Sequence, residues 1–186
     1  MNTDTFWQLI DTARAADAPL QEALTDLLVA QGEEQVLAFE VCMGRLDTVI
    51  DRWDVWAVSY LVCGGCSDDS FMDFKAGLIS LGRTWYERVA RCPDDLAEHP
   101  DIQHAFATGV GEAVFCEEMG YVTAAAWERL TSNRDSFYPA LDHYRVGHGV
   151  RNQDHDMGQG FDFDNADEMR QRLPQLAALY LEGVQR

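Results

Sequence analysis

The residues with the clearest capacity for chemistry lie in a short stretch that follows two glycines at positions 64–65. Ser67, Asp68 and Asp69 come shortly after this pair, and Asp73 follows four residues after Asp69. Residues four apart on a helix lie on the same face, so Asp69 and Asp73 can direct their carboxylates at one point. Two convergent carboxylates suit a cation, or the amine or hydroxyl group of a ligand.

The same stretch also has a purely structural interpretation, and the sequence leaves both open. Ser67 can accept a hydrogen bond from the free backbone N–H groups at the start of a helix. Asp68 and Asp69 would then interact favourably with the positive end of the helix dipole. We predict a binding site that combines this corner with two aromatic residues of the preceding segment: Trp56, Tyr60, Ser67, Asp68, Asp69 and Asp73.

A second candidate is the Cys-x-x-Cys pair formed by Cys63 and Cys66. This spacing occurs in zinc sites and in redox motifs. No second Cys-x-x-Cys pair follows, so a zinc site would need His143 and His148 to complete it. A thioredoxin-like redox motif needs a preceding strand, and the sequence predicts none. The remaining interpretation is that both thiols pack around a tight corner, as free cysteines commonly do.

Motifs of common enzyme classes are absent from the sequence. It contains no Gly-x-Ser-x-Gly nucleophile elbow, no P-loop and no dinucleotide-binding fingerprint. We therefore expect no cofactor and favour a protein without enzymatic activity. The alternative is a metal-binding protein or metal-dependent enzyme whose ligands are three acids of the corner and a downstream histidine: Asp68, Asp69 and Asp73 with His143 or His148.

The elements that must position these residues are all predicted to be helices. Apolar residues recur at spacings of three and four, and no stretch shows the sustained alternation of a strand. We expect positive φ angles at the glycine pair, which ends one helix before Ser67 caps the next. The first of the other expected helices begins at Thr3 or Asp4, and the next two cover Pro19 to Gly32 and residues 36–50. Later helices are expected around Trp85 up to Pro93, over residues 101–118 and around Trp127. The last two begin at Asn165 and at Pro174.

Two later segments lead to specific expectations. One continuous helix is predicted over Asp101–Glu118, because Ile102, Phe106, Val110 and Ala113 fall in line. Beyond Thr131 the helical period fails, and residues 132–165 contain several glycines, a proline and three of the five histidines. We predict a long irregular segment there, of a kind that is usually functional or mobile.

Composition and charge set the broad class. The 186 residues are 47% hydrophobic, enough to bury one sizeable core, and we predict a single compact all-α domain over residues 1–186. Fourteen Lys and Arg against 32 Asp and Glu give a net charge of −18, which argues against partners rich in phosphate, namely nucleic acids and anionic membranes. No apolar run is long enough to span a membrane, and the first residues are acidic rather than basic and then apolar. Five cysteines without framework spacing favour reduced thiols, so we expect a cytoplasmic protein.

The negative charge is concentrated near the start of the chain. Residues 1–51 hold ten acidic side chains but two basic ones, Arg14 and Arg45. One interpretation is a solvated surface that keeps the protein in solution. The other is an acidic face that docks a basic partner.

The central stretch resembles an uncharacterised bacterial family, domain of unknown function 4240. The residues that carry this resemblance are Phe6–Ile10, Trp56–Tyr60, Gly64–Phe71, Asp73–Phe74, Leu78–Ile79, Gly82–Arg83 and Leu173–Leu176. The resemblance spans about residues 3–180 and implies a helical fold. The family is sometimes fused to regulator-like modules, and it carries no activity or catalytic residue over to this chain.

The function that these observations favour is therefore binding. We predict a cytoplasmic regulatory or interaction domain that engages a protein partner or a small-molecule ligand. The predicted contact surfaces are the acidic face of residues 1–51 and the corner from Ser67 to Asp73.

Overall fold

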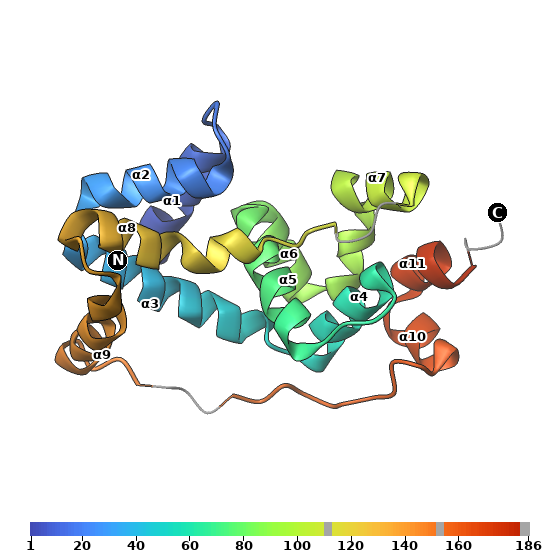
Figure 1. Ribbon diagram of the computed structural model, residues 1–186. Coiled ribbons are helices and arrows are strands. Elements are labelled where there is room, and N and C mark those ends of the chain that lie inside the picture. The colour runs from blue at the N-terminus through green and yellow to red at the C-terminus, as the bar shows by residue number, and fades with distance from the viewer. Residues whose placement is uncertain (110–112, 152–154, 183–186) are drawn as a thin grey trace. The chain divides into compact units, whose positions relative to one another are not determined.

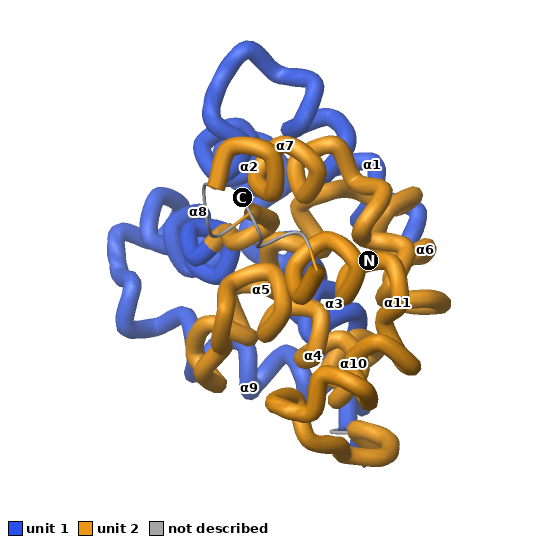
Figure 2. Tube along the Cα trace, turned by 90° about the vertical axis from the view of Figure 1, so that its right-hand side faces the viewer, with its two compact units in different colours: residues 1–48, 117–155 blue, residues 49–116, 156–186 orange. Residues whose placement is uncertain are grey.

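The computed structural model describes residues 1–109, 113–151 and 155–182. Every regular element in these residues is helical and they contain no strand, so the all-α prediction is confirmed (Figure 1). The chain forms two compact units, one of residues 1–48 and 117–155, the other of residues 49–116 and 156–186 (Figure 2). That residues 1–186 make one domain stays a prediction. In the described part, no helix is both long and apolar enough to cross a membrane.

The first unit packs around aromatic and aliphatic side chains from both of its segments. Its elements are α1 (Thr3–Arg14), α2 (Leu20–Gln31), α3 (Glu33–Ile50, counted here up to Thr48), η2 (Glu117–Tyr121), α8 (Val122–Thr131), η3 (Arg134–Ser136) and α9 (Phe137–Gly147). Helix α2 packs against α1 and α8. Phe6 of α1 stacks on Phe39 of α3 with ring centroids 4.4 Å apart, and both are fully buried. Phe6 and Phe39 thus join α1 to α3, while α2 lies against α1 and α8.

The second unit surrounds α4 and α5. Its elements are α4 (Trp53–Cys63), α5 (Asp68–Ser80), α6 (Arg83–Arg91), η1 (Pro93–Glu98), α7 (Pro100–Thr108), α10 (Ala166–Arg172), α11 (Pro174–Ala177) and the π-helical turn η4 (Ala178–Glu182). Buried Asp94 joins the unit's two segments, because its carboxylate accepts hydrogen bonds from the backbone N–H groups of Gln175 and Leu176 at 2.9–3.1 Å. These are unpaired donors at the start of α11, so Asp94 satisfies them as a cap would.

Most helix ends follow the capping chemistry that the sequence predicts. Helix α2 begins after Pro19 and ends at Gly32, which has a φ of +85°. Asn165 accepts from the N–H groups of Asp167 and Glu168 at the start of α10. The prediction for the first helix was wrong by one or two residues, since Asn2 rather than Thr3 or Asp4 is its cap. The Asn2 carboxamide oxygen accepts from the Thr5 N–H at 2.8 Å.

The single helix predicted over Asp101–Glu118 is not formed. Helix α7 ends at Thr108, and Gly109 takes the left-handed conformation with a φ of +69° while its N–H donates to the carbonyl of Ala105. A glycine enters this conformation without steric cost and commonly ends a helix. Val110, which the prediction placed in line with Ile102, lies outside the described residues.

The irregular segment predicted over residues 132–165 is in part a helix. Helix α9 occupies Phe137–Gly147, with Phe137 and Leu141 buried one turn apart. Pro139 stands in its first turn, where the missing N–H removes no helical hydrogen bond, so the proline does not break the helix. In the described part of the remainder, residues 148–151 and 155–165, no helix or strand is present.

Candidate functional site

The predicted corner is built by two glycines in left-handed or related conformations. Helix α4 ends at Cys63, and Gly64 and Gly65 have φ angles of +68° and +133°. The Gly65 N–H donates to the carbonyl of Tyr60 at 2.9 Å. Positive φ at both glycines was predicted and is confirmed. The turn delivers the chain to Ser67, where α5 begins.

Ser67 caps α5, as the structural interpretation expects. Its hydroxyl oxygen accepts from the Ser70 N–H at 3.2 Å and lies 3.0 Å from the Ser70 hydroxyl. Asp68 and Asp69 are exposed in the first turn, where they complement the helix dipole. The start of α5 therefore has a complete local explanation.

Asp73 lies one turn beyond Asp69, and its setting is different. Asp69 is exposed, whereas Asp73 is half-buried and its backbone carbonyl accepts from the Cys116 N–H at 3.2 Å. The side chain of Met72, between them in sequence, is 62% exposed. The corner thus offers solvent two carboxylates, from Asp68 and Asp69, beside one large apolar side chain, and its role in binding stays a prediction.

Trp56 and Tyr60 are committed to contacts inside the second unit. The Trp56 ring stacks on Trp53 and on Phe71 with centroids 5.4 and 4.7 Å away, and its indole N–H donates to the Cys66 carbonyl at 3.2 Å. The Tyr60 hydroxyl donates to the Asp164 carboxylate at 2.5 Å. This hydrogen bond raises the pKa of the Tyr60 phenol, with smaller contributions from burial and from the charge of Asp164. Both aromatic residues therefore fasten the corner to its surroundings.

An extended segment near the end of the chain runs along α4, which the sequence did not reveal. The Trp53 N–H donates to the Met157 carbonyl at 3.1 Å, and the Phe163 ring contacts the rings of Trp53 and Tyr60. Phe161 in turn packs on Phe163. Residues two apart in an extended chain point to the same side, so the Phe161 and Phe163 spacing was the available signal.

Cys66 of the Cys-x-x-Cys pair packs against the end of α4. Cys66 lies with its sulfur 2.8 Å from the Ser59 hydroxyl, and burial raises the pKa of its thiol, with hydrogen bonds from Ser59 and Trp56 acting against this. A raised pKa keeps the thiol protonated and weakly nucleophilic. All five cysteines are free, as predicted.

The metal alternative has no ligand set in the described part of the chain. No group of three or more His, Cys, Asp or Glu side chains there is arranged to hold a metal ion. His143 and His148 belong to the first unit, whereas Asp68, Asp69 and Asp73 belong to the second. His143 is exposed on α9, and the His148 ring stacks on Tyr144 with centroids 3.9 Å apart. The described residues thus give the metal alternative no ligand set, and the sequence spacing alone carried no information on the packing of α9.

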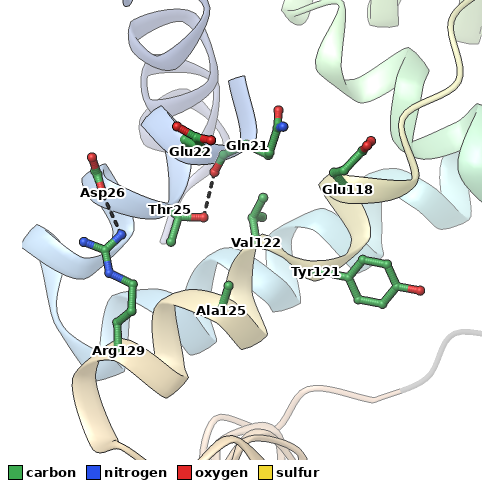
Figure 3. Close-up of a pocket in the computed structure, with 9 residues that line it drawn as sticks. All are labelled: Gln21, Glu22, Thr25, Asp26, Glu118, Tyr121, Val122, Ala125 and Arg129. Atoms are coloured by element: carbon green, nitrogen blue, oxygen red, sulfur yellow. Dashed lines mark hydrogen bonds and ion pairs between the residues drawn. The ribbon is translucent and has the colours of Figure 1, made fainter. Parts of the chain in front are cut away.

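The first unit contains a pocket of about 470 Å³ between α2 and the η2–α8 segment, called here the α2–α8 pocket (Figure 3). Its lining comprises Gln21, Glu22, Thr25, Asp26, Glu118, Tyr121, Val122, Ala125 and Arg129. Val122 and Ala125 point from α8 toward Thr25 of α2 (Figure 3). The Thr25 hydroxyl donates to the Gln21 carbonyl at 2.7 Å, so the α2 wall presents little free hydrogen-bonding capacity at that point. The short side chain of Ala125 leaves the space between the helices.

The rim of the α2–α8 pocket is acidic. Glu22, Asp26 and Glu118 are exposed carboxylates, set against one guanidinium, that of Arg129. Arg129 pairs with Asp26 at 2.5 Å (Figure 3). Seven of the ten acidic side chains of residues 1–51 are exposed, and Glu22 and Asp26 of the pocket rim are two of them. The pocket therefore combines apolar walls with an acidic rim. The sequence indicated the excess of acidic residues in 1–51 but not the pocket, and a single acidic face stays a prediction.

Comparison with known proteins identifies a family without assigning an activity. No curated protein and no solved structure matches the chain. A family described as "Protein of unknown function (DUF4240)" matches residues 1–129. The match includes the whole corner but ends before Leu173–Leu176, where the resemblance was expected to continue. Because it covers more than half of the 186 residues, the chain belongs to the DUF4240 family.

Proposed function

We propose that the protein is a regulatory or interaction domain, without enzymatic activity, that binds a basic and partly apolar ligand at the α2–α8 pocket. The observation that carries this proposal is the pairing of apolar walls with an acidic rim in one pocket of about 470 Å³. The ligand chemistry that matches it best is a positively charged segment of a protein partner.

The walls and the rim recognise different parts of such a ligand. Lysine and arginine side chains have an apolar stem and a charged end. The stem would pack against Val122 and Ala125, while Glu22 and Glu118 attract the charge. A pocket of this volume is in the range that takes up a small molecule or a few side chains.

The wider charge distribution supports the same ligand class. A net charge of −18 attracts positively charged partners over the distance that salt permits, which raises the rate of encounter. The pocket then supplies the short-range contacts that a solvated acidic surface lacks. Complementary charge contributes to encounter and orientation more than to affinity, so the apolar walls are needed for specific binding.

The corner from Ser67 to Asp73 forms a second contact surface in this proposal. Asp68 and Asp69 are exposed, and Met72 presents a large apolar side chain to solvent. Methionine adapts its shape to different partners and is common at binding surfaces. We assign the corner a smaller contribution than the pocket, because Trp56 and Tyr60 are already occupied by internal contacts. Free cysteines fit the reducing cytoplasm, where we place the protein.

The test uses a synthetic amphipathic peptide of leucine and lysine as the probe, with affinity measured by isothermal titration calorimetry. The variant Glu22→Gln/Glu118→Gln removes two charges from the rim and should weaken binding about tenfold. The matched control Glu33→Gln/Glu34→Gln removes two exposed charges from the first turn of α3 and should change affinity by less than about twofold. Equal losses in the two variants would show that net charge alone attracts the peptide and would overturn the proposal.

A further inference from the structure

A second pocket in the first unit has the opposite charge. It has a volume of about 660 Å³ and is called here the arginine pocket, lined by Val41, Gly44, Arg45, Thr48, Arg145, Gly149, Val150 and Arg151. Lysine and arginine make up 14 of the 186 residues, yet three of these eight described lining residues are arginines and none is acidic. In a protein with a net charge of −18, this concentration of cations needs an explanation.

One wall of the arginine pocket is a single face of α3. Val41, Gly44, Arg45 and Thr48 stand at helical spacings of three and four, which places them on one side of the helix. A side chain at Gly44 would meet no neighbouring atom within 4 Å, so open space lies above this position. The glycine therefore helps to keep the pocket open beside the Arg45 guanidinium.

The opposite wall is the end of α9 and the turn that follows it. Gly149 adopts a φ of +63°, and the Val150 N–H donates to the Arg145 carbonyl at 2.9 Å. This closing turn satisfies a terminal carbonyl of α9 with a backbone donor. The turn also directs Val150 and Arg151 back to the pocket that Arg145 lines.

The carboxylates of the described residues pair only weakly with Arg145 and not with Arg45. Arg145 pairs with Asp142 at 3.8 Å, but both side chains are partly exposed and such a long solvated pair contributes little. Arg45 has no carboxylate partner among residues 1–109, 113–151 and 155–182. The charge of Arg145 also acts on Glu40, but burial raises the pKa of the Glu40 carboxyl. Glu40 already accepts a hydrogen bond from the Thr123 hydroxyl at 2.7 Å. Arg45 and Arg145 are thus available to an external anion.

We propose that the arginine pocket binds a small ligand that carries a diphosphate group. A guanidinium is planar and holds two phosphate oxygens through two parallel hydrogen bonds. The ammonium group of a lysine cannot form this paired geometry. Three guanidiniums match the several charges of a diphosphate better than the single charge of one carboxylate. The volume exceeds what a diphosphate alone fills, which leaves room for an attached group of nucleoside size. This site is separate in residues and in charge from the α2–α8 pocket.

The test measures the binding of inorganic pyrophosphate by calorimetry, with ADP and citrate as parallel ligands and sodium chloride added to equal ionic strength. We expect saturable binding of pyrophosphate, binding of ADP at least as tight, and weaker binding of citrate. If citrate binds as tightly as pyrophosphate, the pocket recognises charge without phosphate geometry and the proposal is wrong. The absence of saturable pyrophosphate binding overturns it as well.

Variants tie the binding to the pocket. Arg145→Gln should weaken pyrophosphate binding on the order of tenfold, and so should Arg45→Gln, which tests the same claim at an exposed position. Arg45→Lys keeps the charge but loses the planar guanidinium, so its affinity should fall between those of the wild type and Arg45→Gln. The control is Arg14→Gln, because Arg14 forms an i,i+3 pair with Asp11 at 3.9 Å that resembles the Arg145–Asp142 pair. Equal affinity in the wild type, Arg45→Gln and Arg145→Gln would contradict the proposal, as would an equal loss in Arg14→Gln.

Discussion

The corner in the second unit and the α2–α8 pocket in the first differ in where their unusual residues find partners. At the corner, Trp56, Tyr60 and Ser67 each have an internal partner, in the Cys66 carbonyl, the Asp164 carboxylate and the Ser70 N–H. At the pocket, exposed carboxylates, among them Asp26 in its pair with Arg129, surround apolar walls that no side chain of the described residues fills. The most distinctive stretch of the sequence therefore has a role in the fold, and in our proposal an ordinary-looking acidic helix provides the space for a ligand.

An unusual sequence pattern can therefore reflect the needs of the fold as well as those of a binding site. A glycine pair, a capping serine and stacked aromatic rings are demanding in geometry, so they stand out even when their role is to position a turn. A ligand pocket between two helices needs little more than a small residue and suitable charges at the right places. Changes at the corner should therefore affect stability first, and changes at the pocket should affect binding first.

The largest expected effect is at Gly77 of α5. A Cβ there would stand 1.7 Å from the carbonyl oxygen of Val114, which is backbone and cannot rotate away. We expect Gly77→Ala to destabilise the protein by about 3 kcal/mol, at the upper end of overpacking. Chemical denaturation measures this. The control is Gly44→Ala in α3, where no atom lies within 4 Å and alanine should be neutral or stabilising by about 0.5–1 kcal/mol. Similar stabilities in the two variants would contradict the close approach at α5.

The next effect is at Asp94, which caps α11 from the other segment of the second unit. Replacing it with alanine leaves two backbone N–H groups, of Gln175 and Leu176, without their acceptor. We expect Asp94→Ala to lower the free energy of unfolding by about 2 kcal/mol, since these donors are buried or half-buried. Amide exchange should quicken at 173–178 before the rest of the unit. Asp135→Ala on the exposed turn before α9 is the control, with an expected change below about 0.5 kcal/mol.

Ser67 tests the structural side of the corner more finely. Loss of the cap in Ser67→Ala should cost about 1 kcal/mol, whereas Ser67→Asp keeps an acceptor and should be nearly neutral. Asp69→Asn should change stability by a few tenths of a kcal/mol through the helix dipole. Thermal melts of the three variants measure the series. A large loss of stability in Asp69→Asn would mean that its carboxylate has a structural role beyond the dipole.

Glu40 differs from the exposed carboxylates of residues 1–51, because it is largely buried and has an internal hydrogen-bond partner in Thr123. Burial raises its pKa above 4.5, while the Thr123 hydrogen bond and Arg145 act in the opposite direction. The folded state therefore holds the proton more tightly, and stability falls as pH rises from the ordinary pKa through the raised one. Glu40→Gln keeps an oxygen for Thr123 but does not titrate. Its stability relative to the wild type should increase over that pH window and then level off, as followed by denaturation at several pH values. A constant difference would contradict the raised pKa.

Local chemistry explains which features could be predicted from the sequence. The positive φ at Gly64 and Gly65, the cap at Ser67 and the start of α10 after Asn165 depend on neighbouring residues, and all are confirmed. The end of α7 at Gly109 was also a local signal, but the apolar spacing across it gave the stronger and misleading pattern.

Long-range packing explains what the sequence did not show. Phe163 contacts Trp53 and Tyr60, which lie about a hundred residues earlier in the chain. Because the segment that holds Phe163 is extended, its sequence has no helical period from which such a contact could be predicted. The α2–α8 pocket likewise exists because Ala125 faces Thr25, which depends on how two distant helices pair. Neither pairing follows from propensity or spacing within one segment.

The most direct test of the account is the affinity of the leucine–lysine peptide for two variants that each lose two carboxylates. Glu22→Gln/Glu118→Gln changes the α2–α8 pocket, and Asp68→Asn/Asp69→Asn changes the corner. The account predicts about tenfold weaker binding for the pocket variant and no more than about threefold for the corner variant, measured at one ionic strength. An equal or larger loss in the corner variant would contradict the assignment of the pocket as the main binding site.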